Sequence, residues 1–221
     1  MSAASHADPV LVLTGIRQEI AGRLVLDLPE LTAAAGEHTL MLGPSGSGKT
    51  TLLHIIAGIL RPTAGRVVVA GHDFAGMGAA AIDALRGRQI GIVFQTLHLI
   101  GALTVRQNLR LARSLAGLPA DDDRIAAMLA DLHIGHLADK RPGALSQGEA
   151  QRAAIGRAVI NAPALILADE PTSALDDDNC AAVMGLLQQQ AERSGATLLV
   201  ATHDARLSRH FERQLRLEAR P

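Results

Sequence analysis

Four short apolar runs constrain the fold of this 221-residue chain more than any other feature. They lie at residues 40–42, 90–94, 165–168 and 198–201, and none alternates between polar and apolar side chains. Continuous runs of this length are typical of strands buried on both faces, as in a parallel sheet between layers of helices. Helical patterns lie between the runs, including residues 49–60 and 177–193. We therefore expect a doubly wound α/β core.

Three segments near the N-terminus read instead as half-buried strands. They are residues 10–14, 23–27 and 66–70, each bounded by Gly or Pro, and they predict an antiparallel layer. A last strand is expected near residues 214–218. The segment from about 104 to 141 breaks the α/β alternation, with helical patterns at 105–116 and 121–132. We interpret it as an inserted helical subdomain, in which the acidic run 121–123 marks a helix N-terminus rather than a metal site.

The composition limits what the chain can do. Its aromatic residues are Phe74, Phe94 and Phe211, with no Trp or Tyr, so the core must be aliphatic. A net charge of −1 gives no reason to expect broad electrostatic binding of nucleic acid. The single Cys180 excludes an intramolecular disulfide and fits a reducing compartment. No apolar run approaches the roughly 18–20 residues that cross a bilayer, so we expect a cytosolic protein or one held at a membrane by a partner.

Residues 43–50 read Gly-Pro-Ser-Gly-Ser-Gly-Lys-Thr and match the phosphate-binding loop pattern in full. They follow a predicted buried strand and open a helix, which is the context that the motif needs. Backbone N–H groups of such a loop wrap the phosphates, Lys49 reaches the β- and γ-phosphates, and the Thr50 hydroxyl can bind Mg²⁺. The nucleotide-binding residues predicted here are Gly43, Pro44, Ser45, Gly46, Ser47, Gly48, Lys49, Thr50 and Thr51. The loop predicts phosphate binding and leaves the reaction open.

Two carboxylates, Asp169 and Glu170, close the apolar run at 165–168. Asp169 is placed to hold Mg²⁺ as the second partner of the phosphate loop. Glu170 can then orient and deprotonate an attacking water. Asp-Glu pairs are common on protein surfaces, but this pair follows a buried strand and precedes Pro171, which disfavours a surface role.

A second phosphate-binding element lies at residues 145–149, Leu-Ser-Gln-Gly-Glu, where a Ser-x-Gly loop opens a helix. Together with the first loop, the chain holds more phosphate-binding elements than one bound nucleotide needs. This surplus implies two chains that share their nucleotides.

These motifs occur in the order found in ATP-binding subunits of ABC transporters, and the chain resembles that family over nearly its whole length. The motifs are residues 43–50, Gln95, 145–152, 169–170, 173–176 and His203. Residues 91–95 and 145–149 are most similar to the lipoprotein-releasing and macrolide-exporter group. The resemblance implies a P-loop NTPase core with an antiparallel β layer and an inserted helical subdomain. The expected single domain spans 1–221, with the core at 9–95 and 162–221 and the subdomain at about 96–161.

The resemblance also implies roles for particular residues. Gln95 contacts Mg²⁺ or the attacking water, and His203 holds the γ-phosphate and positions Glu170. Ser146 and Gly148 bind the γ-phosphate held by a second subunit, with Asp176 at the same interface. The implied assembly is a head-to-tail homodimer that sandwiches two ATP molecules. The implied catalytic residues are thus Glu170, His203 and Gln95, and the implied Mg²⁺ ligands are Thr50, Gln95 and Asp169.

Such a subunit hydrolyses ATP to power a separate transmembrane permease, and it lies on the cytoplasmic face of the inner membrane without binding nucleic acid. The subdomain and residues 96–103 are expected to form a groove for a cytoplasmic helix of the permease, although Leu97, Leu99 and Ile100 can equally be core. The alternative is a soluble ABC-type ATPase that acts on nucleic acid or ribosomes. Such proteins typically carry tandem cassettes or long coiled-coil insertions, and this sequence has neither.

Two departures from the family pattern affect the nucleotide. Gln147 and Glu149 differ from the usual Leu-Ser-Gly-Gly-Gln loop, and Glu149 adds a negative charge near the phosphates. The aromatic residue that often stacks on adenine falls near Ile20, and no aromatic precedes Phe74. We therefore predict modest ATP affinity and weak discrimination against GTP, because base–aromatic stacking contributes about 1–3 kcal/mol elsewhere.

Overall fold

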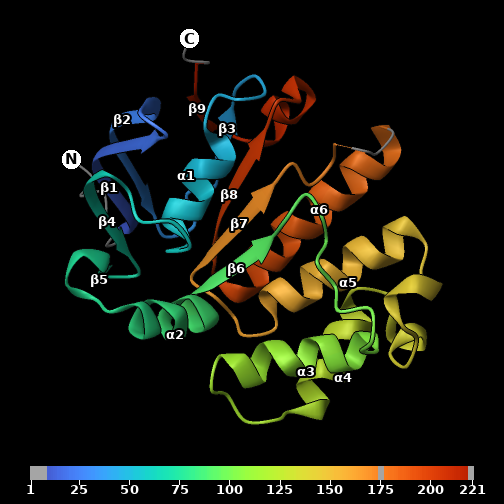
Figure 1. Ribbon diagram of the computed structural model, residues 1–221. Coiled ribbons are helices and arrows are strands. Elements are labelled where there is room, and N and C mark those ends of the chain that lie inside the picture. Colours follow the sequence, from blue (N-terminus) through green and yellow to red (C-terminus); the bar gives the residue numbers. More distant parts are fainter. Residues whose placement is uncertain (1–8, 174–176, 219–221) are drawn as a thin grey trace, which may run out of the picture.

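A five-stranded parallel sheet forms the centre of the computed structural model, which describes residues 9–173 and 177–218 (Figure 1). Its strand order is β6-β7-β8-β3-β9. The strands are β3 (Thr39–Leu42), β6 (Ile90–Val93), β7 (Leu165–Asp169), β8 (Thr197–Thr202) and β9 (Arg213–Arg216). Every neighbouring pair in this sheet is parallel. The four apolar runs and the expected last strand therefore all belong to one parallel sheet.

Both faces of this sheet are buried, as the lack of alternation predicted. In β7, Leu165 and Leu167 pack into one core cluster while Ile166 and Ala168 pack into the other. The first cluster contains residues of helix α1 (Lys49–Ile56) and of the antiparallel sheet. The second contains residues of the helices that follow β6. Burying each Leu or Ile side chain on such faces contributes about 1.5–3 kcal/mol to the stability of the sheet.

The antiparallel layer has the order β2-β1-β4-β5 and covers α1 and one face of the parallel sheet (Figure 1). Its strands are β1 (Pro9–Ile20), β2 (Arg23–Ala34), β4 (Ala64–Val69) and β5 (His72–Asp73). The three predicted strands are confirmed, but β1 and β2 are longer than expected. Ala21 and Gly22 both have positive φ (51° and 77°), so a tight turn lets the hairpin pair as far as Ile20 and Arg23.

The helices are α1, α2 (Ala79–Gln89), α3 (Val105–Leu115), α4 (Asp122–Asp131), α5 (Gln147–Val159) and α6 (Asp177–Ser194). Short 3₁₀ helices occur at η1 (Phe74–Gly76), η2 (Gly135–Leu137), η3 (Pro142–Ala144) and η4 (Ala205–His210). The sequence patterns predicted α1, α3, α4 and α6 and the start of α5, whereas α2 was not anticipated. The predicted first helix was too long, because the chain leaves the helix at Ala57 and Gly58 has φ of +65°.

The acidic run at 121–123 begins a helix, as predicted. Asp121 is the N-cap of α4 and its side chain accepts a hydrogen bond from the Arg124 N–H at 2.9 Å. Asp122 pairs with Arg110 of α3. Carboxylates at this end of a helix stabilise its dipole, so the run needs no metal.

Helices α3, α4 and α5 pack together beside β6, on the side of the parallel sheet away from the antiparallel layer (Figure 1). A Cβ at Gly91 of β6 would lie 2.3 Å from the Ala158 carbonyl oxygen, so α5 approaches this strand more closely than any larger residue permits. The subdomain boundaries at about 96 and 161 remain predictions. None of the described helices combines the length and apolar character that a membrane span requires.

Candidate active site

The loop between β3 and α1 has the backbone shape that phosphate binding requires. Gly46 and Gly48 have φ of +80° and +86°, which other residues adopt only at a cost. A Cβ at Gly43 would lie 2.5 Å from both the Leu217 carbonyl oxygen and Ser47 Oγ. Glycine is therefore needed at these positions for local structural reasons, before any ligand is considered.

Lys49 is nearly fully buried, with 6% of its surface exposed, and its side chain is bonded to the phosphate-binding loop. Its Nζ donates to the carbonyl oxygens of Gly43 at 2.8 Å and Pro44 at 3.0 Å. The same ammonium lies 3.7 Å from Oε1 of Glu170. A buried cation is thus fixed between the phosphate loop and the second carboxylate of the site.

Asp169, the last residue of β7, provides a donor set that fits Mg²⁺. Its Oδ2 accepts a hydrogen bond from Thr50 Oγ1 at 2.8 Å, whereas its buried Oδ1 has no partner among the described residues. Burial raises the pKa of Asp169, and the Thr50 hydrogen bond opposes this shift. Among the described residues, no group of three or more His, Cys, Asp or Glu is placed to hold a metal ion by itself. One carboxylate and one hydroxyl suit Mg²⁺, which usually completes its shell with water and substrate phosphates.

Glu170 follows β7 in a left-handed backbone conformation, with φ of +47°. Its N–H donates to the Ala201 carbonyl at 2.8 Å, which ties it to β8. Its Oε2 accepts from Thr202 Oγ1 at 2.8 Å, and its Oε1 lies 2.9 Å from His203 Nδ1. The backbone N–H of His203 also donates to Oε1, at 3.1 Å. Strained residues held in this way cluster at functional sites.

One cavity of about 270 Å³ brings the predicted catalytic residues together. Gln95, Glu170 and His203 lie just beyond the carboxyl ends of β6, β7 and β8, where open parallel sheets bind ligands. The lining comprises these three with Val25, Ser45, Gly46, Gly48, Lys49, Thr50 and Thr51. Gly43 and Pro44 line an adjoining cavity that also contains His203. Ser47 is buried behind the loop, and its Oγ has no hydrogen-bond partner in the described structure.

Two residues of the site were missed by the sequence interpretation. The Thr202 oxygen accepts from the Asp204 N–H at 3.0 Å, so its own proton is directed to Glu170. Its position at the end of an apolar strand beside His203 could have indicated this. Val25 comes from the antiparallel sheet, and its carbonyl lies 3.1 Å from where a Cβ of Gly48 would be. No local pattern identifies Val25.

The second phosphate-binding element lies outside this cavity. Ser146 is the N-cap of α5 and Gly148 lies in its first turn, and both are exposed. Glu149 Oε2 accepts from Ser146 N at 2.7 Å and from Ser146 Oγ at 2.8 Å. These bonds, the backbone bond first, lower the pKa of Glu149. Asp176 lies outside the described residues.

The sequence matches known proteins along most of its length. The sequence profile described as ABC transporter matches residues 26–173. The lipoprotein-releasing system ATP-binding protein LolD of Anaeromyxobacter dehalogenans is 41% identical over 218 residues, covering 96% of this chain and 91% of that protein. The macrolide export ATP-binding/permease protein MacB 1 of Aeromonas hydrophila is 40% identical, covering 96% of this chain and 33% of its own length.

The fold is also that of solved ATP-binding cassettes. A dimeric post-hydrolysis structure of the cassette MJ0796, bound to ADP and Pi, has a TM-score of 0.84 and 32% identity. The match covers 96% of this chain and 97% of the cassette. The chain therefore belongs to the ABC transporter family and is one of its ATP-binding, ATP-hydrolysing subunits.

Proposed function

We propose that two copies of this chain close around two ATP molecules and drive a separate permease of the lipoprotein-releasing type. The observation that carries the proposal is the separation of the two phosphate-binding elements. Lys49, Glu170 and His203 share one cavity, while Ser146 and Gly148 are exposed residues at the start of α5, outside that cavity. A phosphate-binding element on the exposed surface of one chain can complete the nucleotide site of a second chain, as in a two-fold dimer.

Within each site, the chain supplies positioning and charge rather than covalent chemistry. Lys49 and the phosphate loop hold the triphosphate, and Glu170 takes the proton of the attacking water. His203 holds the γ-phosphate, and its contact with Glu170 orients the carboxylate. Thr50, Asp169 and Gln95 would hold Mg²⁺, which neutralises charge on the phosphates when bound.

The surface that receives the permease is a groove of about 530 Å³ between the core and helices α3 and α5. Ile59, Ile100 and Leu115 line it with 49%, 43% and 74% of their surfaces exposed. Leu99 instead packs against the core, so of the two apolar residues Leu99 and Ile100 only Ile100 is available to a partner. An apolar groove of this kind suits one face of an amphipathic helix. We assign it to a cytoplasmic helix of the permease.

This role places the chain on the cytoplasmic face of the inner membrane, held there by the permease. The relatives named for lipoprotein release support the same class of cargo for this system. Binding and hydrolysis of ATP change the closure of the dimer, and this difference drives the permease.

The test is to replace Glu170 by Gln in the purified chain. The variant should bind ATP and form a stable dimer on gel filtration but lose turnover by at least about a hundredfold, because the base is removed while the loop is intact. Glu192→Gln, an exposed carboxylate change on α6, is the matched control. Turnover retained by Glu170→Gln would remove Glu170 as the base, and a monomer in saturating ATP would contradict the shared site.

A further inference from the structure

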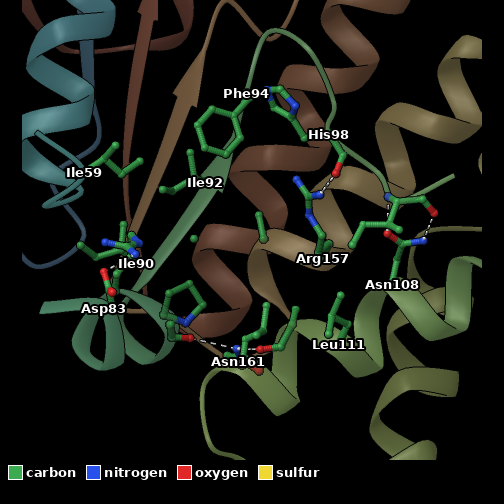
Figure 2. Close-up of a pocket in the computed structure, with 18 residues that line it drawn as sticks. Ile59, Asp83, Ile90, Ile92, Phe94, His98, Asn108, Leu111, Arg157 and Asn161 are labelled. Atoms are coloured by element: carbon green, nitrogen blue, oxygen red, sulfur yellow. Dashed lines mark hydrogen bonds and ion pairs between the residues drawn. The ribbon is translucent and has the colours of Figure 1, made fainter. Parts of the chain in front are cut away.

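The segment 96–103, which follows Gln95, is held by side chains of two helices. Asn108 of α3 accepts from the Ile100 N–H at 2.8 Å and donates to the carbonyl oxygens of Ile100 at 3.2 Å and Leu103 at 3.3 Å. Arg157 of α5 holds the other end of the segment, donating to the carbonyls of Leu97 and His98. Figure 2 shows the bond to His98. The path of the chain beyond Gln95 therefore depends on these two residues.

The Arg157 contacts flank a strained residue. His98 has φ of +49°, a left-handed conformation that costs energy for a residue with a Cβ. Nη2 of Arg157 bonds the Leu97 carbonyl at 3.0 Å, and Nη1 bonds the His98 carbonyl. The guanidinium fork thus joins the peptide groups on the two sides of His98. Lysine cannot make this planar two-point contact.

An aromatic contact links His98 to Phe94, the residue before Gln95. The ring of His98 packs edge-on against Phe94, with ring centroids 5.2 Å apart. Phe94 immediately precedes Gln95, which lines the nucleotide cavity. Fixing the backbone at His98 consequently fixes the approach of Gln95 to that cavity.

The two backbone carbonyls are the hydrogen-bond partners that the structure gives to the Arg157 side chain. The side chain is half-buried and forms no ion pair within the described residues, and burial lowers its pKa. Its charge is compensated by the two carbonyl groups. It also lines the proposed docking groove, as do His98 and Asn108. Arg157 lies on α5, whose N-cap is Ser146, so one helix carries both the second phosphate-binding element and the contacts with the segment after Gln95.

We propose that Arg157 is a positioning residue for Gln95, and that its two bonds across His98 couple helix α5 to the carboxyl end of β6, where Gln95 lines the nucleotide cavity. Movement of α5, when Ser146 meets the nucleotide of the partner chain, is passed through Arg157 to Gln95. The inference rests on the proposed function, because it assigns a coupling element to the same ATPase site.

The test compares Arg157→Met and Arg157→Lys with Arg124→Met in the full-length chain. Arg124 is a matched control because its Nε also bonds a backbone carbonyl, that of Ile160, at 2.7 Å, but away from the segment. In Arg157→Met we expect kcat to fall about tenfold and the Mg²⁺ concentration for half-maximal activity to rise about fivefold. The ATP dissociation constant should change by less than about twofold, since Lys49 and its loop are untouched. For Arg157→Lys, kcat and the Mg²⁺ concentration for half-maximal activity should lie between the values of Arg157→Met and those of the wild type.

Hydrogen exchange provides a second measurement that needs no turnover. The amides of residues 97–104 should exchange faster in both Arg157 variants than in the wild type, while those of α1 and β7 keep their protection. The inference is overturned if Arg157→Met matches Arg124→Met in kcat, Mg²⁺ dependence and exchange. It is also overturned if Arg157→Lys has the wild-type kcat, Mg²⁺ dependence and hydrogen exchange. A loss of ATP affinity in Arg157→Met as large as its loss of kcat would overturn it as well. A wild-type chain without ATPase activity would instead contradict the proposed function.

Discussion

The two phosphate-binding elements of this chain differ in how completely one chain builds them. The loop at 43–51 is embedded, since Ser47 and Lys49 are buried and Lys49 is bonded to its own loop and paired with Glu170. The element at Ser146 and Gly148 is exposed, and Glu149 of the same chain occupies its donors. The first is preorganised by the fold, whereas the second becomes a site only against another chain. Equivalent substitutions in the two elements should therefore fail in different ways.

The largest effect is expected from Gly48→Ala in the embedded loop. Gly48 has φ of +86°, which strains a residue with a Cβ, and that Cβ would lie only 3.1 Å from the Val25 carbonyl oxygen. Strain of this kind costs about 1–3 kcal/mol. We expect a lower melting temperature, weaker ATP binding and roughly a hundredfold loss of turnover. Calorimetry and nucleotide titration measure these effects, and an unchanged ATP affinity would show that the loop is less rigid than its geometry indicates.

Gly148→Ala makes the same chemical change in the exposed element. A Cβ there meets nothing within 4 Å and the backbone needs no positive φ, so the single chain should fold as well as before. Alanine is the better helix former, by up to about 1 kcal/mol. ATP binding to the monomer should be unchanged, while ATP-dependent dimerisation and turnover fall by about tenfold or more. Sedimentation with ATP separates the two effects, and normal turnover would contradict a phosphate site at Gly148.

Ile20→Tyr should strengthen ATP binding only at the part of the site that a single chain supplies, which includes the phosphate loop. Ile20 lies at the end of β1 with 50% of its surface exposed, where the family pattern places an aromatic residue. A base–aromatic stack should tighten ATP binding by about tenfold and increase discrimination against GTP. Competition titrations with the two nucleotides measure this. Equal gains for ATP and GTP, or none, would place adenine away from Ile20.

The smallest change expected is that of Glu149→Gln. Gln can keep the capping box with Ser146, so α5 should start as before, but the negative charge beside the partner's phosphates is removed. We expect dimerisation in the Glu170→Gln background to need about two- to threefold less ATP, an effect that salt reduces. Titrations at low and high salt test this. A weaker dimer would mean that Glu149 assists closure.

The sequence predicted the parallel sheet, the antiparallel layer and most of the helices, because buried and half-buried elements leave different periodicities. Helix α2 was missed, since its residues 79–89 have few buried apolar positions beyond Ile82 and Leu85. The predicted site residues that one chain supplies, among them Lys49, Asp169 and Glu170, lie together because each stands at or next to the end of a helix or strand at one edge of the sheet.

What the sequence determined by itself was local: the glycines of the phosphate loop, the carboxylates that end β7 and the cap that starts α5. Each depends on neighbours within a few residues, so a short pattern contains the whole requirement. Only the tertiary structure decided that Val25 lines the nucleotide cavity, that Thr202 aims Glu170 and that Arg157 holds the backbone at His98. These contacts join residues distant in the chain, and strand order and helix packing bring them within hydrogen-bonding distance, which no local pattern encodes.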